Sequence, residues 1–191
     1  MNFVTFTLIL FMIMREVKTL SSIRKGAKLN IYWFRNTDLR LHDNPALLKG
    51  LSNSKEDGLL PVFCFDKRTF GSSCVTEFGS MKIGPKRAQF LIESVTDLRK
   101  SIEKMGGGLY VSLCTPEETF SQLTIDKEVV SAYCQEEITS EELKIGKTVN
   151  NILKQKSGRL ESIWGSTLYD PEDLPFYGGV KDLPDTCKSR I

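Results

Sequence analysis

The sequence of 191 residues has few of the residues that build metal centres and disulfide frameworks. It contains a single histidine, His42, and no Cys-x-x-Cys pair among its five cysteines. A zinc site needs clustered His or Cys ligands, and a disulfide framework usually has an even number of cysteines. We therefore expect no metal and a reducing compartment. Cys64, Cys114 and Cys134, which lie in or beside apolar runs, are interpreted as small core residues.

An excess of charge of one sign is also lacking. The 26 Lys and Arg residues stand against 24 Asp and Glu residues, which gives a formal net charge of +2. This argues against a protein that holds nucleic acid by electrostatics alone, although it is compatible with a local basic patch. The apolar run over residues 3–14 is too short to span a bilayer as a helix, so we expect no stable membrane insertion.

Residues 1–28 are expected to be a leader outside the fold. The apolar run is followed by basic residues at positions 15, 18, 24, 25 and 28. No positive residue precedes the run and no clear small-x-small cleavage site follows it, as a signal peptide would require. The leader is then disordered, mis-annotated or an organelle-targeting segment. Mitochondrial or plastid targeting and a nuclear or cytoplasmic location both stay open.

Apolar runs alternate with helical patterns from residue 29 onward. We expect strands over residues 29–34, 58–66, 109–114, 128–134 and 160–164. Helices are expected over 44–51, 85–105 and 140–154 and from Thr115 onward, with a long irregular loop over 67–81. This alternation predicts an α/β, Rossmann-like fold whose five-stranded parallel sheet has helices on both faces. Right-handed crossovers favour the strand order 3-2-1-4-5.

Charged side chains follow the first and the fourth expected strands. In the order 3-2-1-4-5 the winding reverses between these two strands, and open α/β sheets bind ligands at such a point. The candidate site residues are Arg35, Asp38, Arg40 and Asp43 after the first strand, and Glu136 and Glu137 after the fourth. The structural alternatives are that the charged residues of the first loop pair with one another and that the carboxylates of the second loop lie on the solvated surface. A carboxylate after the fourth strand offers acceptors for the N–H groups of a heterocycle.

Local signals elsewhere favour structure over catalysis. Asp43 or Asn44 can cap the helix over 44–51, with Pro45 in its first position. The glycines at 106–108 follow a helix and lack a subsequent Lys-Ser/Thr, so they predict a helix stop and not a phosphate loop. Trp164 is interpreted as core packing at the end of the fifth strand. Since no catalytic triad, paired-acid arrangement or metal cluster emerges, the sequence suggests a binding domain without a complete catalytic centre.

Four ordered motifs resemble the photolyase/cryptochrome family. They are WFRNTDLRLHDNPAL at 33–47, PVFCFD at 61–66, GPKRAQFLIES with DLR at 84–99, and WGSTLY with DLPF at 164–176. The last motif is similar to the DASH-type cryptochrome branch in particular. The resemblance covers residues 29–185 and identifies the chain as an N-terminal antenna domain of that type.

The resemblance implies a domain plan and cofactors. In the family, an N-terminal α/β domain holds a light-harvesting antenna, often methenyltetrahydrofolate, and a larger C-terminal helical domain holds FAD and the lesion-binding pocket. DASH-type members are implied to repair cyclobutane pyrimidine dimers, chiefly in single-stranded DNA, by blue-light-driven electron transfer from reduced flavin. The resemblance places the folate-contacting carboxylate at Glu137, with Glu136 as the fallback. The usual motif has one residue between Arg35 and Asp38, where this sequence has Asn36 and Thr37.

The expected domains are a leader over 1–28, the antenna domain over 29–170 and a truncated interdomain linker over 171–191, without the FAD-binding helical domain. On this division the chain is a truncated DASH-type cryptochrome that is not catalytic by itself. FAD is not expected in it, DNA binding is weak or absent, and folate is half exposed. The alternative is a chromophore-free regulatory or partner-binding fragment. An unrelated nucleotide-binding α/β domain would need a Gly-rich loop after strand 4 or 5, which the sequence lacks.

Overall fold

The computed structural model describes residues 28–54, 58–70, 78–165, 167 and 173. Its strands are β1 (Lys28–Phe34), β2 (Leu59–Cys64), β3 (Tyr110–Ser112), β4 (Glu128–Gln135) and β5 (Arg159–Ile163). Its helices are α2 (Pro45–Ser54), α3 (Lys67–Phe70), α4 (Pro85–Lys104), α5 (Pro116–Asp126) and α6 (Ser140–Lys154). None of these helices is long and apolar enough to cross a membrane.

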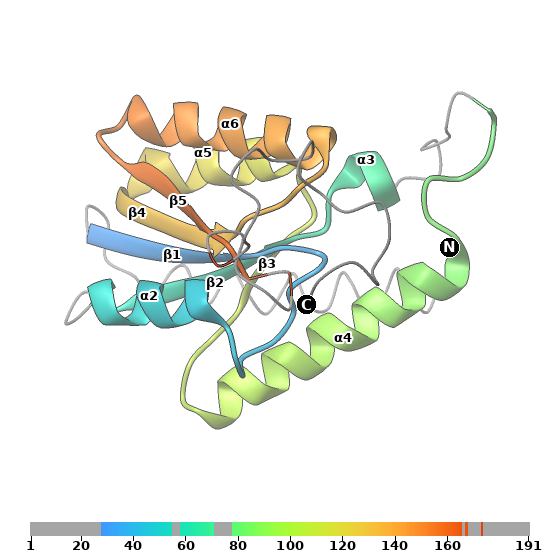
Figure 1. The fold of residues 1–191 in the computed structure, drawn as a ribbon, viewed down its shortest axis with the longest axis horizontal. Coiled ribbons are helices and arrows are strands. Elements are labelled where there is room, and N and C mark those ends of the chain that lie inside the picture. Colours follow the sequence, from blue (N-terminus) through green and yellow to red (C-terminus); the bar gives the residue numbers. More distant parts are fainter. Residues whose placement is uncertain (1–27, 55–57, 71–77, 166, 168–172, 174–191) are drawn as a thin grey trace.

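The five strands form one parallel sheet in the order β3-β2-β1-β4-β5 (Figure 1), which confirms the predicted order. β1 lies in the centre, which is why residues 29–34 are all buried. Helices α2 and α4 cover one face of the sheet, and α5 and α6 cover the other (Figure 1). The direction of winding therefore reverses between β1 and β4, and the carboxyl ends of these strands flank the crevice.

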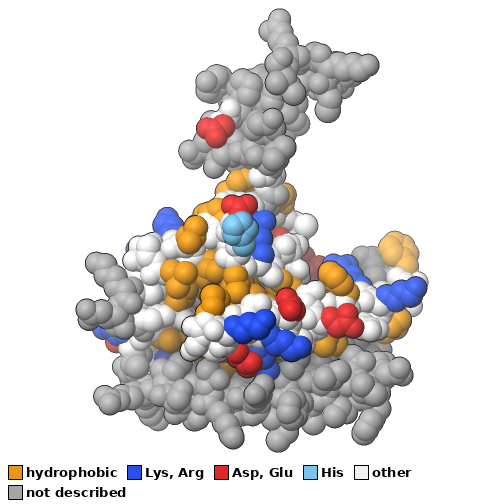
Figure 2. All heavy atoms as spheres, turned by 90° about the horizontal axis from the view of Figure 1, so that it is seen from below, with side chains coloured by type: hydrophobic (Ala, Val, Ile, Leu, Met, Phe, Trp, Pro, Cys, Tyr) orange, Lys and Arg blue, Asp and Glu red, His pale blue; other side chains and the backbone are white. Residues whose placement is uncertain are grey.

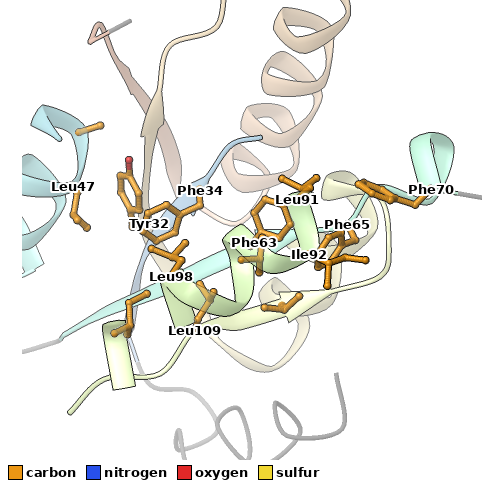
Figure 3. Close-up of a cluster of buried hydrophobic side chains, with 14 of the residues drawn as sticks. Tyr32, Phe34, Leu47, Phe63, Phe65, Phe70, Leu91, Ile92, Leu98 and Leu109 are labelled. Atoms are coloured by element: carbon orange, nitrogen blue, oxygen red, sulfur yellow. The ribbon is translucent and has the colours of Figure 1, made fainter. Parts of the chain in front are cut away.

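Each face of the sheet has its own hydrophobic core, because successive strand side chains point to opposite sides. Tyr32 and Phe34 of β1 belong to the core under α2 and α4, together with Leu91 and Leu98 of α4 (Figure 3). Trp33 belongs to the opposite core under α5 and α6. Burying one such side chain stabilises a fold by about 1.5–3 kcal/mol, so this alternation positions the loop after β1 firmly.

The helix boundaries follow the capping signals of the sequence. Of the two candidate caps for α2, Asn44 is used, since its Oδ1 accepts a hydrogen bond from the backbone N–H of Leu47 at 2.9 Å. Asp43 is exposed and has a φ of 51°, a left-handed conformation that Asp tolerates better than most residues. Thr115 and Glu118 form a capping box at α5. The glycine run ends α4 as predicted, with Gly106 at a φ of 83°.

Two structural expectations were wrong. Residues 67–81 do not form an irregular loop throughout, because α3 occupies the first four of them. Phe70 is buried there, with its ring 5.2 Å from that of Phe65. Trp164 is not a core residue; it is half-buried, and its Nε1 donates a hydrogen bond to Thr167 Oγ1 at 2.8 Å. In both cases a local tertiary contact outweighed the pattern of neighbouring residues.

The remaining expectations about cysteines and boundaries need small adjustments. Cys64 and Cys134 are buried as predicted, whereas Cys114 is half-buried. The first strand begins at Lys28, one residue before the expected start of the antenna domain. The rest of the predicted leader lies outside the described residues, and so does the predicted linker over 171–191 except for Asp173.

Candidate functional site

Arg35 is the first residue after β1, and its side chain is 5% exposed. Its guanidinium carbon lies 4.0 Å from the centroid of the Trp33 ring. Its Nη2 pairs with the carboxylate of Glu142 in the first turn of α6. Its Nε lies 4.0 Å from Oε1 of Glu137, which follows β4. A buried guanidinium stays charged and needs such acceptors, so Arg35 ties together the three segments that meet at the crevice.

Asp38 is buried with 2% exposure and is held by residues of its own loop and strand. Its Oδ2 accepts hydrogen bonds from the Tyr32 hydroxyl at 2.8 Å and from Asn44 Nδ2 at 3.0 Å. Its Oδ1 lies 3.3 Å from Arg40 Nε. Burial raises the pKa of the Tyr32 phenol well above its ordinary value, and the negative charge of Asp38 adds to the effect, so the phenol stays a donor. These contacts favour a structural role for Asp38.

A short turn sends the loop after β1 toward the loop after β4. The backbone N–H of Asp38 donates to the carbonyl of Arg35 at 3.1 Å, which leaves Asn36 and Thr37 exposed at the tip. Thr37 Oγ1 donates a hydrogen bond to Glu137 Oε1 at 2.6 Å. The Glu137 side chain is 13% exposed, and within the described ranges both of its polar contacts involve Oε1. Its Oε2 therefore has acceptor capacity left.

Arg40 and Asp43, the other two candidates of the first loop, are not among the residues that contact Glu137 within the described ranges. Arg40 Nη2 donates to the carbonyl of Gly165 at 3.2 Å, which brings the loop after β5 alongside. Asp43 lies at the exposed start of α2. The structure thus brings Arg35 together with Glu137. Arg40 instead contacts the loop after β5, and Asp43 lies before the start of α2.

A small cavity of about 150 Å³ lies between the carboxyl ends of β4 and β5 and helix α6. Arg35, Glu136, Glu137 and Glu142 are among its lining residues. The half-buried Glu136 also continues the sheet, because its backbone N–H donates to the carbonyl of Ile163 at 2.8 Å. Pockets that enclose a drug-sized ligand usually measure 300–1,000 Å³. This cavity can therefore hold one edge of a larger ligand and leaves the remainder at the surface.

A second cavity of about 350 Å³ lies on the other side of the Arg35–Glu142 pair, at the carboxyl ends of β1 and β2. Its lining includes the following side chains that sequence reasoning did not select: Trp33, Asp66, Arg68, Lys82, Glu141 and Glu142. The position of Asp66, two residues after the end of β2, was the one usable signal, since ligand sites lie at strand ends. Glu142 carried no comparable signal because it faces Arg35 only through the packing of α6.

The charges around this larger cavity compensate one another. Arg68 pairs with Asp66 below the cavity and also with Glu117 of α5 at 3.0 Å. Lys82 lies 3.5 Å from Glu141. Burial raises the pKa of the Cys64 thiol to about 12, so this cysteine in the lining is a neutral thiol and a poor nucleophile. In the described part of the chain, no group of three or more His, Cys, Asp or Glu residues could hold a metal ion.

Comparisons with known proteins show which family the chain belongs to. The family model described as DNA photolyase matches residues 30–189. The chain belongs to the DNA photolyase family. Cryptochrome DASH, chloroplastic/mitochondrial, of Arabidopsis thaliana is 43% identical over 164 residues, with 85% of this chain and 28% of the relative covered. Cryptochrome DASH of Gloeobacter violaceus is 40% identical over 160 residues, with 84% and 30% covered.

Solved structures of this family share the fold. The crystal structure of a Synechocystis sp. cryptochrome matches with a TM-score of 0.73 and 36% identity, covering 86% of this chain and 32% of that one. An archaeal photolyase from Sulfolobus tokodaii matches with a TM-score of 0.58 at 22% identity, over 71% of this chain and 29% of that one. This photolyase/cryptochrome chain therefore spans about a third of the length of its relatives and corresponds to their N-terminal α/β domain.

Proposed function

We propose that this chain is the antenna domain of a DASH-type cryptochrome and that it holds the heterocycle of methenyltetrahydrofolate at the carboxyl end of β4. Glu137 is the residue proposed to bind the heterocycle, with Glu136 as the neighbouring acceptor. Arg35 is proposed to hold Glu137 in place and to compensate its charge. The chromophore, when bound, supplies the near-UV absorption of an antenna, whereas the residues named here only bind and orient it.

The position and the hydrogen bonding of the Glu137 carboxylate are the observation that supports this proposal. Its carboxylate lies at the point where the winding of the sheet reverses, where α/β sheets bind ligands. Its Oε1 is held by Thr37, and its Oε2 makes no hydrogen bond within the described ranges. The amino group and ring N–H of a pterin are donors, and an ionised carboxylate offers only acceptors, so the two sets of groups are complementary. A hydrogen bond to a charged acceptor is stronger than a neutral one.

The size of the neighbouring cavity predicts how the ligand is held. A cavity of 150 Å³ encloses one edge of the bicyclic pterin but not the benzoyl-glutamate tail. The tail would extend over the surface in the absence of further protein. We therefore expect the isolated chain to bind folate weakly, because much of the ligand keeps its contact with water.

A titration of the purified chain with methenyltetrahydrofolate tests the proposal. Saturable quenching of the ligand's fluorescence, with a shift of its near-UV absorption band, is expected for the wild-type chain. Glu137→Gln should weaken binding by more than about tenfold, because a neutral amide replaces the charged acceptor. Asp43→Asn is the matched control, since it makes the same change from acid to amide at an exposed carboxylate before α2 and should bind like the wild type. Equal binding by Glu137→Gln and the wild type would contradict the assignment.

A chromophore-free, partner-binding fragment is the second candidate. It is favoured by exposed apolar side chains on the outer surface of the layer formed by α2 and α4, namely Leu48, Leu51 and Phe90. Figure 2 views the molecule from this side and shows hydrophobic side chains among Lys and Arg side chains. Failure of the wild-type chain to bind folate in the titration would favour this candidate.

The resemblance implies FAD binding and DNA repair for full-length members of the family. We do not propose either function for residues 28–165 alone. Because the resemblance assigns FAD and the DNA lesion to a helical domain, we propose that these residues alone do not repair DNA. Light-dependent repair of a dimer-containing oligonucleotide by the purified chain would contradict this. The Arabidopsis relative is named chloroplastic/mitochondrial, which favours the organellar location over the nuclear or cytoplasmic one. Imaging a fluorescent fusion of residues 1–28 in plant cells distinguishes these locations.

A further inference from the structure

The turn after β1, from Arg35 to Asp38, is fixed at both ends. At one end, Arg35 is stacked on Trp33 at 4.0 Å and paired with Glu142. At the other end, Asp38 is buried and accepts the Tyr32 hydroxyl at 2.8 Å. The turn itself is closed by the 3.1 Å hydrogen bond between the backbone of these two ends. Since both ends are fixed, the two residues at the tip have little freedom.

The fixed turn brings Thr37 into contact with the candidate site. Its hydroxyl crosses the crevice between β1 and β4 and donates to Glu137 Oε1 at 2.6 Å. Arg35 Nε lies 4.0 Å from the same oxygen. The carboxylate therefore has one oxygen directed to the turn, and its other oxygen keeps its acceptor capacity.

We infer that Thr37 is a positioning residue that holds the Glu137 carboxylate in the orientation in which Oε2 accepts the N–H groups of a bound heterocycle. This inference rests on the proposed function. A free Glu side chain loses rotamer entropy when it is fixed. When the side chain is already held in the unliganded protein, that loss does not reduce the binding free energy. Thr37 thus acts on the affinity for the ligand without touching the ligand.

A purely structural role makes a different prediction. If the hydroxyl only joined the loops after β1 and β4, its removal would lower stability and leave affinity unchanged. The contact is exposed, and exposed hydrogen bonds contribute little to stability because water replaces the partner. The positioning role therefore predicts a change in affinity at nearly constant thermal midpoint.

The experiment compares Thr37→Val with Thr37→Ser in the full chain, with methenyltetrahydrofolate as the probe. Valine has nearly the shape of threonine without the hydroxyl, whereas serine keeps the hydroxyl. We expect Thr37→Val to weaken binding by about three- to tenfold and Thr37→Ser to bind within about twofold of the wild type. In a Glu137→Gln background, Thr37→Val should cause no further loss, because the two residues act through one contact.

The possible failures can be told apart. Wild-type binding that is lost in Glu137→Gln but unchanged in Thr37→Val would overturn the role of Thr37 and leave the proposed site intact. An equal loss from Thr37→Val with and without Glu137→Gln would also overturn it, because Thr37 would then act independently of Glu137. No binding by the wild-type chain would overturn the proposed function and this inference together. A lowered thermal midpoint with unchanged affinity would assign Thr37 the structural role.

Discussion

The loops after β1 and after β4 each place a carboxylate at the crevice, yet in different states. Asp38 is 2% exposed and accepts hydrogen bonds at Oδ2 from two buried donors. Glu137 is 13% exposed and makes both of its described contacts through Oε1. The first carboxylate is used by the fold itself, whereas the second has capacity for a ligand.

This difference shows how residues from one motif can have different roles. A buried carboxylate is retained only when neighbouring donors satisfy it, since an unpaired buried charge costs several kcal/mol. Tyr32 and Asn44 supply that satisfaction, and Asn44 at the same time caps α2. A carboxylate at the mouth of a cavity carries no such requirement. A variant of Asp38 should therefore change stability, whereas a variant of Glu137 should change binding.

The largest expected effect comes from removing the buried carboxylate. Asp38→Ala should lower the free energy of unfolding by about 2–4 kcal/mol, because the Tyr32 hydroxyl and the Asn44 amide each lose one of their two acceptors and Arg40 loses its ion-pair partner. Urea denaturation followed by circular dichroism measures the loss. Asp43→Asn is the control in the same loop; it keeps a residue that tolerates the positive φ and should stay within about 0.5 kcal/mol of the wild type. Equal losses in both variants would remove the proposed distinction between buried and exposed acids.

The second effect concerns the helix that the buried network supports. Asn44→Ala removes both the cap of α2 and a donor to Asp38. The expected loss of unfolding free energy is about 1–2 kcal/mol, in the upper range for an N-cap. Asn44→Asp retains the capping oxygen but places a second carboxylate beside Asp38, so it should be no more stable than Asn44→Ala. A stability equal to that of the wild type for Asn44→Ala would show that the network does not depend on it.

The third prediction is that a change at Glu137 affects stability very little. Glu137→Gln should alter the free energy of unfolding by less than about 1 kcal/mol, because Arg35 keeps its pairing with Glu142. The same urea denaturation as for Asp38→Ala allows a direct comparison. A loss as large as that of Asp38→Ala would indicate that Glu137 belongs to the structural network and not to a ligand site.

The smallest effect involves an exposed ion pair remote from both loops. Lys67 Nζ lies 2.6 Å from Glu118 Oε1, and this hydrogen bond lowers the pKa of the Glu118 carboxyl below its ordinary value. A carboxyl with a lowered pKa in the folded state contributes stability at neutral pH that is lost as the pH falls through that pKa. Glu118→Gln, which can keep the contact with the Thr115 backbone, should lower the thermal midpoint slightly at pH 7, and this difference should shrink as the pH falls through the lowered pKa of Glu118. A difference that stays constant over this fall in pH would rule out an electrostatic cause.

Much of the fold was predictable from the order of apolar runs. The helix over 85–105 and the strand over 29–34 carried strong patterns, and the structure has α4 over Pro85–Lys104 and β1 over Lys28–Phe34. The segment over 67–81 was less predictable, because four residues of helix depend on Phe70 packing against Phe65. The half-buried position of Trp164, whose Nε1 donates to Thr167 Oγ1, was not predicted either.

The order of apolar runs was enough to predict the parallel sheet and its strand order, because right-handed crossovers allow few arrangements, and the ordered motifs were enough to predict the family. The same pattern predicted charged residues on both sides of the crevice. Which of these residues are buried follows only from the folded arrangement: Asp38 faces Tyr32 and Asn44, whereas Glu137 faces Thr37 across the crevice. The hydrogen bonding of a side chain depends on neighbours more distant in sequence than any local pattern reaches. The loops after β1 and β4 are a hundred residues apart and meet only when the sheet forms.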